Sequence, residues 1–476
     1  MGFLGYDILL FLIVTFVVIL GMPFVIRNND EIISVDRLCN SCLVQGGGHR
    51  VIGAGRETLC VVFKLSRREK VNKADTAFVL AAAGLVLLMT PGLALFYGGM
   101  VRGKNVLGTI MQSFFMIALI SIEWVYLGYS MSFGPDIGGV IGDLSWFALN
   151  GVGTAPSLDY ATTIPHTVFM IYQCMFAIIT PALITGAFAE RVRFVPFLVF
   201  ALLWTLLVYN PVCHWVWAKG GWLAQMGVLD FAGGLVVHVT CGAAAFAAVL
   251  VVGPRRGYGR TSFMPHNLPM TLLGTGLLWF GWFGFNGGSA LAANEVAATA
   301  FVATHLAGMA GMFMWVVMER FVMGNATTLG AASGAVAGLA TITPAAGFVG
   351  PNAAIVIGLL AGVICFLAVR LKSRFNFDDS LDVVGIHGVG GMVGTLCLGI
   401  FASTQVNPNG VDGLLAGNAA QLGKQAIGVA VVGGYTLVVS WILLKVIDAT
   451  MGLRLTEEDE VVGLDSVEHS ETAYNN

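Results

Sequence analysis

Charged residues are scarce in this chain. Only 11% of its 476 residues are Asp, Glu, Lys or Arg, whereas 57% are hydrophobic and the mean hydropathy is +0.83. Soluble domains carry about 25% charged residues. The composition therefore excludes an ordinary soluble domain and predicts a polytopic membrane protein. The net charge of −3 indicates no particular partner, and we expect no nucleic acid among the partners.

The eight cysteines do not form a disulfide framework. Five of them fall in or beside apolar segments and are expected to be reduced and buried: Cys174, Cys213, Cys241, Cys365 and Cys397. Cys39-x-x-Cys42, with His49 and Cys60, matches no strong zinc pattern. We therefore expect no metal and no cofactor. The sequence shows no nucleophile constellation, so an enzyme is not expected.

From Asp75 onward, apolar segments long enough to cross a bilayer follow one another. The 62 glycines predict close packing, because small residues let membrane helices approach one another. We expect an all-α polytopic membrane protein with eleven transmembrane helices, at about residues 75–100, 106–133, 167–188, 195–217, 230–252, 270–290, 296–318, 328–347, 352–370, 383–401 and 426–449.

Basic residues divide the connections between these helices into two sets. One set contains only Lys219 and Lys424. The other contains thirteen basic residues: Arg102, Lys104, Arg191, Arg193, Arg255, Arg256, Arg260, Arg320, Arg370, Lys372, Arg374, Lys445 and Arg454. By the positive-inside rule the second set is cytoplasmic. We expect a multi-pass protein of the cytoplasmic (inner) membrane, with the N-terminus of its core outside and the tail after Met451 inside.

Residues 1–73 differ from the rest. Ile8–Ile26 is apolar and of about spanning length, but it lacks the basic start that is typical of a signal peptide. Nine basic residues follow, from Arg27 to Lys73, on what would be the outer side. The segment is interpreted as a membrane anchor, a cleaved leader, or translated sequence upstream of the true start. We separate it from a core at 74–451 and a tail at 452–476.

Two similar segments place a histidine at membrane depth. Asp230–Gly242 (DFAGGLVVHVTCG) contains His238, and Asp382–Gly394 (DVVGIHGVGGMVG) contains His387. An ionisable residue inside the membrane is costly and marks a candidate functional site, although a packing role is the alternative for each. Because these are the fifth and tenth expected helices, we predict one shared site between two inverted five-helix repeats, with the eleventh helix unpaired.

Several short motifs occur in order from about Ala74 to the end of the chain. They are Thr90–Val106 (TPGLALFYGGMVRGKNV), Gly186–Phe194 (GAFAERVRF), Asp230–His238 (DFAGGLVVH), Pro265–Met270 (PHNLPM), Trp282–Ser289 (WFGFNGGS) and Asp382–Gly391 (DVVGIHGVGG). Together they resemble the ammonium transporter family (Amt/Mep/Rh), and specifically its bacterial and archaeal Amt branch. The resemblance implies a homotrimer in the lipid bilayer, each subunit with its own central pore that conducts ammonium inward. It does not cover residues 1–73.

The substrate that this resemblance implies sets a physical problem. At neutral pH nearly all ammonia is the cation, and moving a bare ion into a medium of low dielectric costs tens of kcal/mol. Potassium has a similar size, so a site that demands a removable proton rejects it better than a carbonyl cage does. The implied order is recruitment of NH4+ outside, deprotonation, passage of NH3 with or without a relayed proton, and reprotonation inside.

Similarity to the family assigns roles to aromatic residues. Trp217, Phe176 and Ser289 match the outer recruitment site, where aromatic faces attract a cation. For Trp217 the alternative is a place in the interfacial aromatic belt. Phe176 and Phe285 match the stacked pair that closes the pore, and Trp282 matches a pore-lining position.

The same similarity places His238 and His387 in contact inside the pore, where a neutral imidazole both donates and accepts a hydrogen. Asp230 is either a helix N-cap or a buried carboxylate that supports the recruitment site without direct contact. Asp382 is interpreted as its repeat counterpart, with a structural role.

Two positions depart from the family pattern. Tyr172 stands where the family often has Phe, and its hydroxyl could alter water at the mouth. The loop between Trp217 and Asp230 is one residue longer than in close relatives and contains Lys219. A cation facing the vestibule would weaken recruitment, so we predict that Lys219 points away.

The acidic tail, residues 452–476, is either a solvated end or a docking surface. It resembles family tails that dock against the inner loops and meet a trimeric PII-type signalling protein. Two alternative functions follow from the resemblance. One is an ammonium sensor, or transceptor, that signals through this tail. The other is a Rh-like channel for ammonia or carbon dioxide, against which the mouth formed by Trp217 and Phe176 argues.

Overall fold

The computed structural model describes residues 71–474. The apolar run Ile8–Ile26 and the zinc candidates between Cys39 and Cys60 lie outside the described residues. The origin proposed for residues 1–73 therefore stays a prediction.

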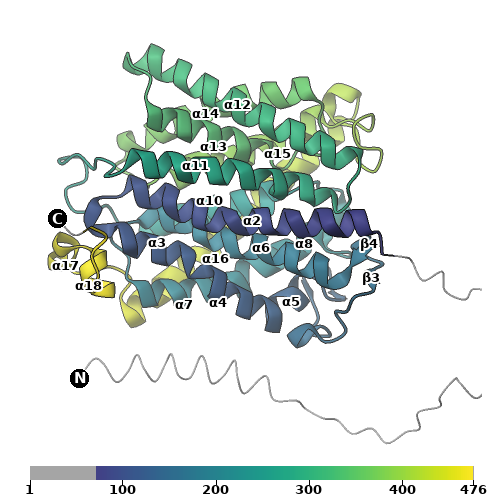
Figure 1. The fold of residues 1–476 in the computed structure, drawn as a ribbon, viewed down its shortest axis with the longest axis horizontal. Helices are drawn as coiled ribbons and strands as arrows, with labels where there is room; N and C mark the ends of the chain where they lie inside the picture. The colour runs from purple at the N-terminus through teal and green to yellow at the C-terminus, as the bar shows by residue number, and fades with distance from the viewer. Residues whose placement is uncertain (1–70, 475–476) are drawn as a thin grey trace, which may run out of the picture. The chain divides into compact units, whose positions relative to one another are not determined.

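Helices dominate the described part of the chain (Figure 1). Their bounds are α2 (Lys73–Met100), α3 (Val106–Phe114), α4 (Met116–Glu123), α5 (Tyr129–Phe133), α6 (His166–Ile184), α7 (Phe194–Trp204), α8 (Asn210–Trp217), α9 (Trp222–Met226), α10 (Thr240–Val252), α11 (Leu268–Trp282), α12 (Glu295–Met323), α13 (Thr328–Ile342), α14 (Pro351–Leu371), α15 (Val389–Phe401), α16 (Ala419–Met451), α17 (Glu457–Val462) and α18 (Leu464–His469). Short π-helical segments, Trp124–Gly128, Thr205–Tyr209, Gly234–Val239, Phe283–Gly287 and Val384–Gly388, join some of these helices into longer rods.

Ten helical segments between residues 71 and 474 are long and apolar enough to cross a membrane. They are Lys73–Met100, Gly103–Phe133, His166–Phe188, Phe194–Met226, Gly234–Val252, Leu268–Ala290, Glu295–Met323, Pro351–Phe375, Val384–Phe401 and Ala419–Met451. The all-α polytopic membrane fold is thus confirmed, but the count of eleven is not.

The missing segment is the expected span 328–347. Its helix, α13, has only 15 residues and ends at Ile342. Pro344 follows two residues later, and a proline cannot donate a backbone hydrogen bond to continue a helix. The chain turns instead through residues 343–348. The prediction from apolar character therefore placed the end of this helix too far along the chain.

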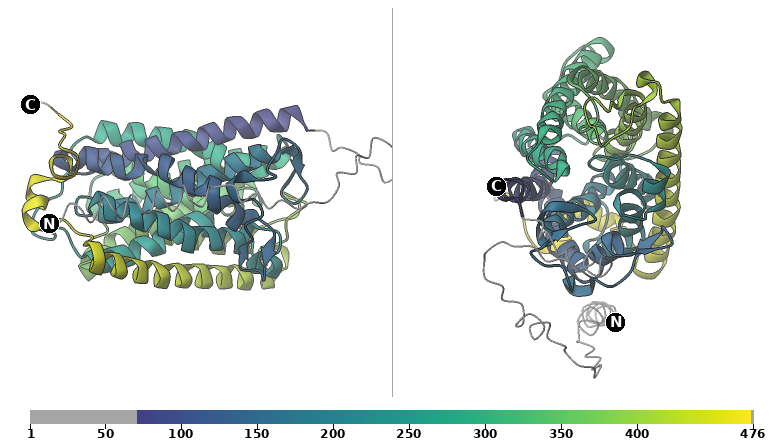
Figure 2. Two further views of the ribbon diagram at one scale, coloured as in Figure 1. Left: turned by 90° about the horizontal axis from the view of Figure 1, so that it is seen from below. Right: turned by 90° about the vertical axis from the view of Figure 1, so that its right-hand side faces the viewer.

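The two ends of the helices carry different structures. The connection 134–166 contains two short antiparallel hairpins: β1 (Asp136–Ile137) with β2 (Ile141–Gly142), and β3 (Pro156–Ser157) with β4 (Ala161–Pro165). The tail helices α17 and α18 lie at the opposite end, beside α3 (Figures 1 and 2).

The two repeats pack on each other reciprocally. α15 packs on the π segment Gly234–Val239, and α10 packs on the π segment Val384–Gly388. Where they cross, Gly242 lies directly against the backbone of Gly388, and a Cβ atom on Gly242 would overlap it. Glycine thus permits the close approach of the two histidine-bearing segments.

The acidic tail is docked rather than solvated over residues 452–474. Asp465 Oδ1 accepts a hydrogen bond from the Gly108 amide at 2.8 Å, and Lys104 Nζ donates to the Glu460 carbonyl at 2.7 Å. Arg454 Nε donates to the Glu460 carboxylate at 2.6 Å. The tail therefore contacts the connections in which basic residues are concentrated.

Buried ion pairs stabilise the end of the helices at which the tail is docked. Glu190, 1% exposed, accepts hydrogen bonds from Arg102 and lies 3.5 Å from Arg255 Nη1. Arg255 also donates to both carboxylate oxygens of Asp378, at 2.9 and 2.8 Å. Burial alone would raise the pKa of Glu190, but the Arg102 hydrogen bond and the charge of Arg255 outweigh it, so the pKa lies below the ordinary value of 4.5.

We expect Glu190→Gln to destabilise the fold by about 3 kcal/mol, because it leaves the partly buried guanidinium group of Arg102 without its carboxylate and removes one of the two carboxylates that Arg255 contacts. The loss should show in the free energy of unfolding in a detergent–SDS titration at pH 7. Because the folded-state pKa is lowered, the Glu190 contribution is present above pH 4.5 and disappears as the pH falls through the folded value. Glu457→Gln is the control, since Glu457 is 81% exposed in its pair with Arg256. Equal stability of both variants would contradict this role.

Candidate functional site

A cavity of about 230 Å³ opens at the hairpin end of the helices. It is lined by Phe133, Asp159, Tyr160, Phe169, Gln173, Phe176, Trp217, Phe231, Ser289 and Leu291. Three of these, Trp217, Phe176 and Ser289, are the predicted recruitment residues. Aromatic faces and a few polar groups surround the space, which suits a small cation. We call this cavity the vestibule.

Two phenylalanine rings close the floor of the vestibule. The rings of Phe176 and Phe285 have centroids 4.4 Å apart, and both residues are 1% exposed. Phe176 also meets Trp217 edge to face, with centroids 5.9 Å apart. Phe176 borders the vestibule, whereas Phe285 borders the next cavity inward. The pair therefore separates the two spaces, as a gate must.

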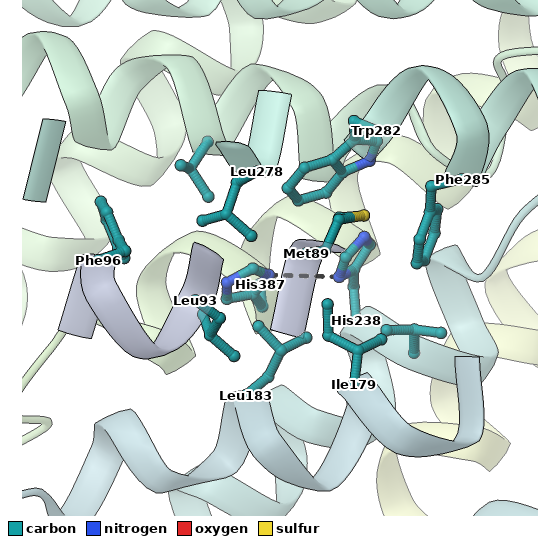
Figure 3. Close-up of a pocket in the computed structure, with 12 residues that line it drawn as sticks. Met89, Leu93, Phe96, Ile179, Leu183, His238, Leu278, Trp282, Phe285 and His387 are labelled. Atoms are coloured by element: carbon teal, nitrogen blue, oxygen red, sulfur yellow. Dashed lines mark hydrogen bonds between the residues drawn. The ribbon is translucent and has the colours of Figure 1, made fainter. Parts of the chain in front are cut away.

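The two predicted histidines lie side by side beyond this gate (Figure 3). His238 Nδ1 and His387 Nδ1 are 3.2 Å apart, and the rings stack with centroids 5.2 Å apart. His238 comes from the π segment Gly234–Val239 and His387 from Val384–Gly388. Phe285 and Phe96 lie on opposite sides of the pair in Figure 3.

Apolar side chains surround the histidines. They line a cavity of about 10 Å³ with Met89, Leu93, Phe96, Ile179, Leu183, Val237, Leu278, Trp282, Phe285 and Val336. That volume is about the minimum that holds one water molecule. The imidazoles are the only titratable groups in this lining, so a small neutral molecule fits here and a hydrated ion does not.

The hydrogen-bond network assigns the tautomers. Thr343 donates its hydroxyl hydrogen to the Leu339 carbonyl at 2.8 Å and accepts from Trp282 Nε1 at 3.0 Å. It therefore faces His238 Nε2, 3.4 Å away, as an acceptor, which puts the hydrogen of His238 on Nε2. His238 Nδ1 is then bare, His387 Nδ1 donates to it, and His387 Nε2 is left as a free acceptor.

Asp230 caps the segment that carries His238. Its carboxylate accepts from the amides of Gly233, Gly234, Leu235 and Val236 at 2.7–3.1 Å. The Asp230 carbonyl accepts from Trp217 Nε1 at 2.8 Å. Both interpretations of Asp230 therefore agree with its contacts. It caps a helical segment, and it supports the recruitment residue Trp217 without lining the vestibule itself.

Asp379, not Asp382, is the structural counterpart of Asp230. Asp379 accepts from the amides of Val383 and Val384 at 3.1 and 2.8 Å and so caps the segment that carries His387. Burial raises its pKa to about 6 against the opposing charge of Lys372. Asp382 instead pairs with Lys372, and its expected role as repeat counterpart is wrong.

Tyr172 lies below the vestibule surface. Its hydroxyl is 2.9 Å from the carbonyls of Gly284 and Phe285 and 3.2 Å from Ser289 Oγ. The side chain is fully buried. The hydroxyl therefore ties α6 to the π segment that carries Phe285, rather than contacting water at the mouth.

Lys219 forms an ion pair with Asp159 at the vestibule rim. Asp159 lines the vestibule, whereas Lys219 is 70% exposed and does not. The prediction that Lys219 points away from the vestibule agrees with this arrangement. It nevertheless neutralises a carboxylate that faces the cavity.

One group of potential metal ligands occurs within the described residues. The donor atoms of His238, Cys241 and His387 lie within 4.8 Å of one another. A thiolate and two imidazoles suit a soft ion such as Cu(I) or Zn(II). The two imidazoles, however, are already hydrogen-bonded to each other.

All five cysteines expected to be buried and reduced are buried free thiols.

The sequence interpretation missed three residues of this site. Asp379 precedes His387 by eight residues, as Asp230 precedes His238, so counting back from each histidine would have found it. Gln173 lines the vestibule with a buried side-chain oxygen that lacks a partner within the described residues. Thr343 gave no local signal, because it reaches the histidines only through the tertiary fold.

A many-helix membrane protein whose two repeats enclose a narrow, histidine-lined cavity has the architecture of a multi-pass transporter or channel. The family model described as Ammonium Transporter Family matches residues 77–474. This chain belongs to that family.

Several known proteins resemble the chain over most of its length. The ammonium transporter of Bacillus subtilis is 51% identical over 401 residues, which cover 84% of this chain and 98% of the relative. The ammonium transporter Amt1 of Archaeoglobus fulgidus is 47% identical over 404 residues, covering 85% and 100%. The crystal structure of Saccharomyces cerevisiae Mep2 matches with a TM-score of 0.77 and 38% identity, covering 82% and 89%. A structure named "Sensor Amt Protein" matches with a TM-score of 0.77 and 30% identity, covering 83% and 98%.

Proposed function

We propose that this protein takes up ammonium across the cytoplasmic membrane by separating NH3 from its proton. The observation that carries the proposal is the histidine pair, which lies in a narrow apolar cavity separated from the vestibule by two phenylalanine rings. Moving a bare cation into such a space costs far more free energy than its contacts with the two imidazoles recover. Neutral ammonia, which both donates and accepts hydrogen bonds, fits it.

Recruitment takes place in the vestibule. Trp217 and Phe176 present aromatic faces to a cation there. Ser289 Oγ gives its hydrogen to the Phe285 carbonyl at 2.9 Å, so a lone pair stays free to accept from an N–H group. The unpartnered oxygen of Gln173 is a second acceptor in the same cavity. Together these groups replace part of the hydration shell of NH4+.

Beyond the gate, the imidazole chain handles the nitrogen and its proton. The bare Nε2 of His387 and the Nδ1–Nδ1 hydrogen bond give a directional chain of donor and acceptor atoms. In the assigned tautomers the pair accepts a proton at His387 Nε2 and releases one from His238 Nε2, toward the gate. Inward relay therefore starts from the inverted tautomers: His238 Nε2 accepts a proton, His238 Nδ1 passes its hydrogen to His387 Nδ1, and His387 Nε2 releases its own, which returns the pair to the assigned tautomers. Passage of NH3 past the pair then accompanies proton relay.

Uptake of labelled methylammonium tests the function directly. A strain without its own ammonium transporters is transformed with the full chain, and uptake is measured at several external pH values. We expect saturable uptake that ammonium competes away and that a thousandfold excess of potassium leaves unchanged. Inhibition by potassium at that ratio would contradict the proposed selectivity.

Lys219→Gln is expected to strengthen recruitment. Removing the ammonium group leaves the Asp159 carboxylate unpaired at the vestibule rim, where it attracts cations. The half-saturating concentration of methylammonium should fall about two- to threefold at low ionic strength, and the difference should vanish at high salt, because surface charges are screened. Adding Asp159→Asn should restore the original value. Lys424→Gln, the other basic residue on this side, is the control.

We propose three further points. The C-terminal side is cytoplasmic, the chain forms a homotrimer, and the docked tails meet a PII-type partner. The exposed acidic residue Glu457 and its neighbours Glu458 and Asp459 offer charge for such a contact. A pull-down with and without 2-oxoglutarate tests it, and binding under neither condition would refute it. Resemblance to the protein named "Sensor Amt Protein" keeps a sensor as the second candidate function.

A further inference from the structure

Cys241 adds a third donor atom to the histidine pair. It follows His238 by three residues, which is about one helical turn, and its thiol donates to the His238 carbonyl at 3.4 Å. The donor atoms of Cys241, His238 and His387 all lie within 4.8 Å of one another, and all three side chains are buried. We call these three residues the Cys–His–His cluster. The proposed passage of ammonia makes no use of Cys241, which does not line the cavity.

The spacing of the two imidazoles suits a single metal ion. His238 Nδ1 and His387 Nδ1 are 3.2 Å apart. Two nitrogens at that separation can both lie about 2.0–2.1 Å from one ion, with an angle of about 100° between the two bonds. A metal–sulfur bond of about 2.3 Å then places the sulfur about 3.7 Å from each nitrogen, so the cluster has to contract by no more than about 1 Å on binding.

The hydrogen between the two rings can move out of the way of an ion. In the assigned tautomers His238 Nδ1 is already bare, and only His387 Nδ1 carries a hydrogen. Moving that hydrogen to His387 Nε2 bares both Nδ1 atoms and leaves both rings neutral. The change gives up one hydrogen bond, and two bonds to the metal replace it.

The charge of the ion decides which metals fit. When the Cys241 thiol binds an ion, its S–H bond breaks, a sulfur–metal bond forms and the proton leaves for bulk water. A monovalent ion therefore takes the place of one proton, and the net charge of the buried cluster does not change. A divalent ion such as Zn²⁺ leaves one positive charge without a partner in the apolar cavity lining. Thiolate is moreover a ligand that selects soft ions such as Cu(I).

We propose that Cys241, His238 and His387 form a binding site for a soft monovalent metal ion, either Cu(I) or Ag(I), and that the bound ion blocks the pore. The ion occupies both Nδ1 atoms and so breaks the hydrogen-bonded chain between the rings. Because the histidines line a cavity of only about 10 Å³, an ion between them also obstructs the path of ammonia. The block rests on the proposed ammonium uptake, whereas the binding site does not. The ion acts as an inhibitor and not as a cofactor.

Cu(I) binding is measured on the purified full chain by competition with a coloured Cu(I) chelator, under argon and with ascorbate. Every sample carries Cys39→Ser, Cys42→Ser and Cys60→Ser, so that only the five buried thiols of the described residues remain. We expect one Cu(I) per chain. Cys241→Ser should weaken binding at least 100-fold, because the serine hydroxyl keeps the hydrogen bond to the His238 carbonyl but is not a soft ligand.

Cys365→Ser is the matched control. Cys365 is also fully buried, and its thiol lies 4.0 Å from the carbonyl of Ile386, the residue before His387, but it is not part of the cluster. Its replacement should leave the Cu(I) affinity within twofold. X-ray absorption at the copper edge should show one sulfur and two nitrogen neighbours in the original and in this control, and one nitrogen fewer in His387→Leu.

Three results would overturn the binding site. They are equal Cu(I) affinity in Cys241→Ser and the original, equal losses in Cys241→Ser and Cys365→Ser, and a copper spectrum without nitrogen neighbours. The second of these would show that replacing any buried thiol weakens binding through packing.

The block is tested separately in proteoliposomes. Equimolar Ag(I) should lower methylammonium uptake at least tenfold in the original and less than twofold in Cys241→Ser, each relative to its own uptake without metal. Uptake that persists in the original with the metal bound would overturn the block. A chain that binds Cu(I) but takes up no methylammonium even without metal would contradict the proposed function and leave the binding site standing.

Discussion

Replacing both buried histidines, His238→Leu with His387→Leu, is expected to lower methylammonium uptake at least 100-fold while the protein stays folded in the membrane. Leucine and histidine have similar volumes, so the cavity of about 10 Å³ stays filled and apolar. What disappears is every titratable group in the lining of this cavity. Positioned proton transfer contributes typically 10²–10⁴-fold to a rate, which sets the expected loss.

The single variants separate a relay from two independent sites. Because the two imidazoles share one hydrogen bond, each single leucine substitution should cost nearly as much as the pair, as is usual for groups that act as a unit. Electrical current on an ammonium jump in proteoliposomes should fall in parallel with uptake. Current that persisted in the double variant would show that the charge crosses by another route.

His305→Leu is the matched control for this experiment. His305 also lies in a spanning helix, α12, but its ring packs on Trp279 and Phe283 at an exposed position, away from the cavity lining. Losing it removes an intramembrane imidazole without touching the histidine pair. Uptake should stay within about twofold of the original, and a large loss would indicate that the leucine substitutions act through packing rather than through proton transfer.

The parts of the fold that the sequence predicted depend on long-range averages. The lengths of the apolar segments located ten of the spans to within a few residues at most ends. The division of the basic residues agrees with the structure, because Arg102, Arg255 and the tail lie at the same end of the helices. Apolar length failed at α13, because composition does not report where Pro344 ends a helix. It also gave no sign of the π segments, which differ from α-helix only in their hydrogen bonds.

The candidate site was predicted unevenly for a related reason. The histidines and the gate lie in recognisable motifs, so His238, His387, Phe176 and Phe285 could be named in advance. Their supports could not, because Thr343 is about 100 residues from His238 in sequence and meets it only in the fold. Asp382 was misassigned because the two motifs were aligned at the first acidic residue of each. Aligning them by the number of residues before the histidine pairs Asp230 with Asp379 instead.

Asp230→Ala is expected to destabilise the protein by about 4 kcal/mol and to abolish uptake. The substitution leaves four backbone N–H groups, at Gly233 to Val236, without the acceptor that now bonds all of them. Each unsatisfied buried donor costs about 1–3 kcal/mol, and partial hydration returns some of that. The free energy of unfolding in an SDS titration measures the loss.

Asp382→Ala provides the comparison for that value, because it removes a carboxylate from the same motif in the other repeat. Asp382 is partly exposed and pairs with Lys372 but caps no helix, so its loss should cost about 1 kcal/mol or less. Asp379→Ala should fall between the two, since Asp379 accepts from two amides rather than four. If Asp382→Ala proved the most damaging of the three, the capping role assigned to the other two would be wrong.

Asp230→Asn distinguishes the cap from the charge. An asparagine keeps one acceptor oxygen and can retain about half of the four amide bonds, but it removes the negative charge beneath the vestibule. If Asp230 acts mainly through the backbone, stability and uptake should both lie between those of the original protein and the alanine variant. If its charge attracts the cation, the asparagine variant should instead be nearly as stable as the original, with a raised half-saturating concentration of methylammonium. The four short amide contacts, and the absence of Asp230 from the vestibule lining, favour the first outcome.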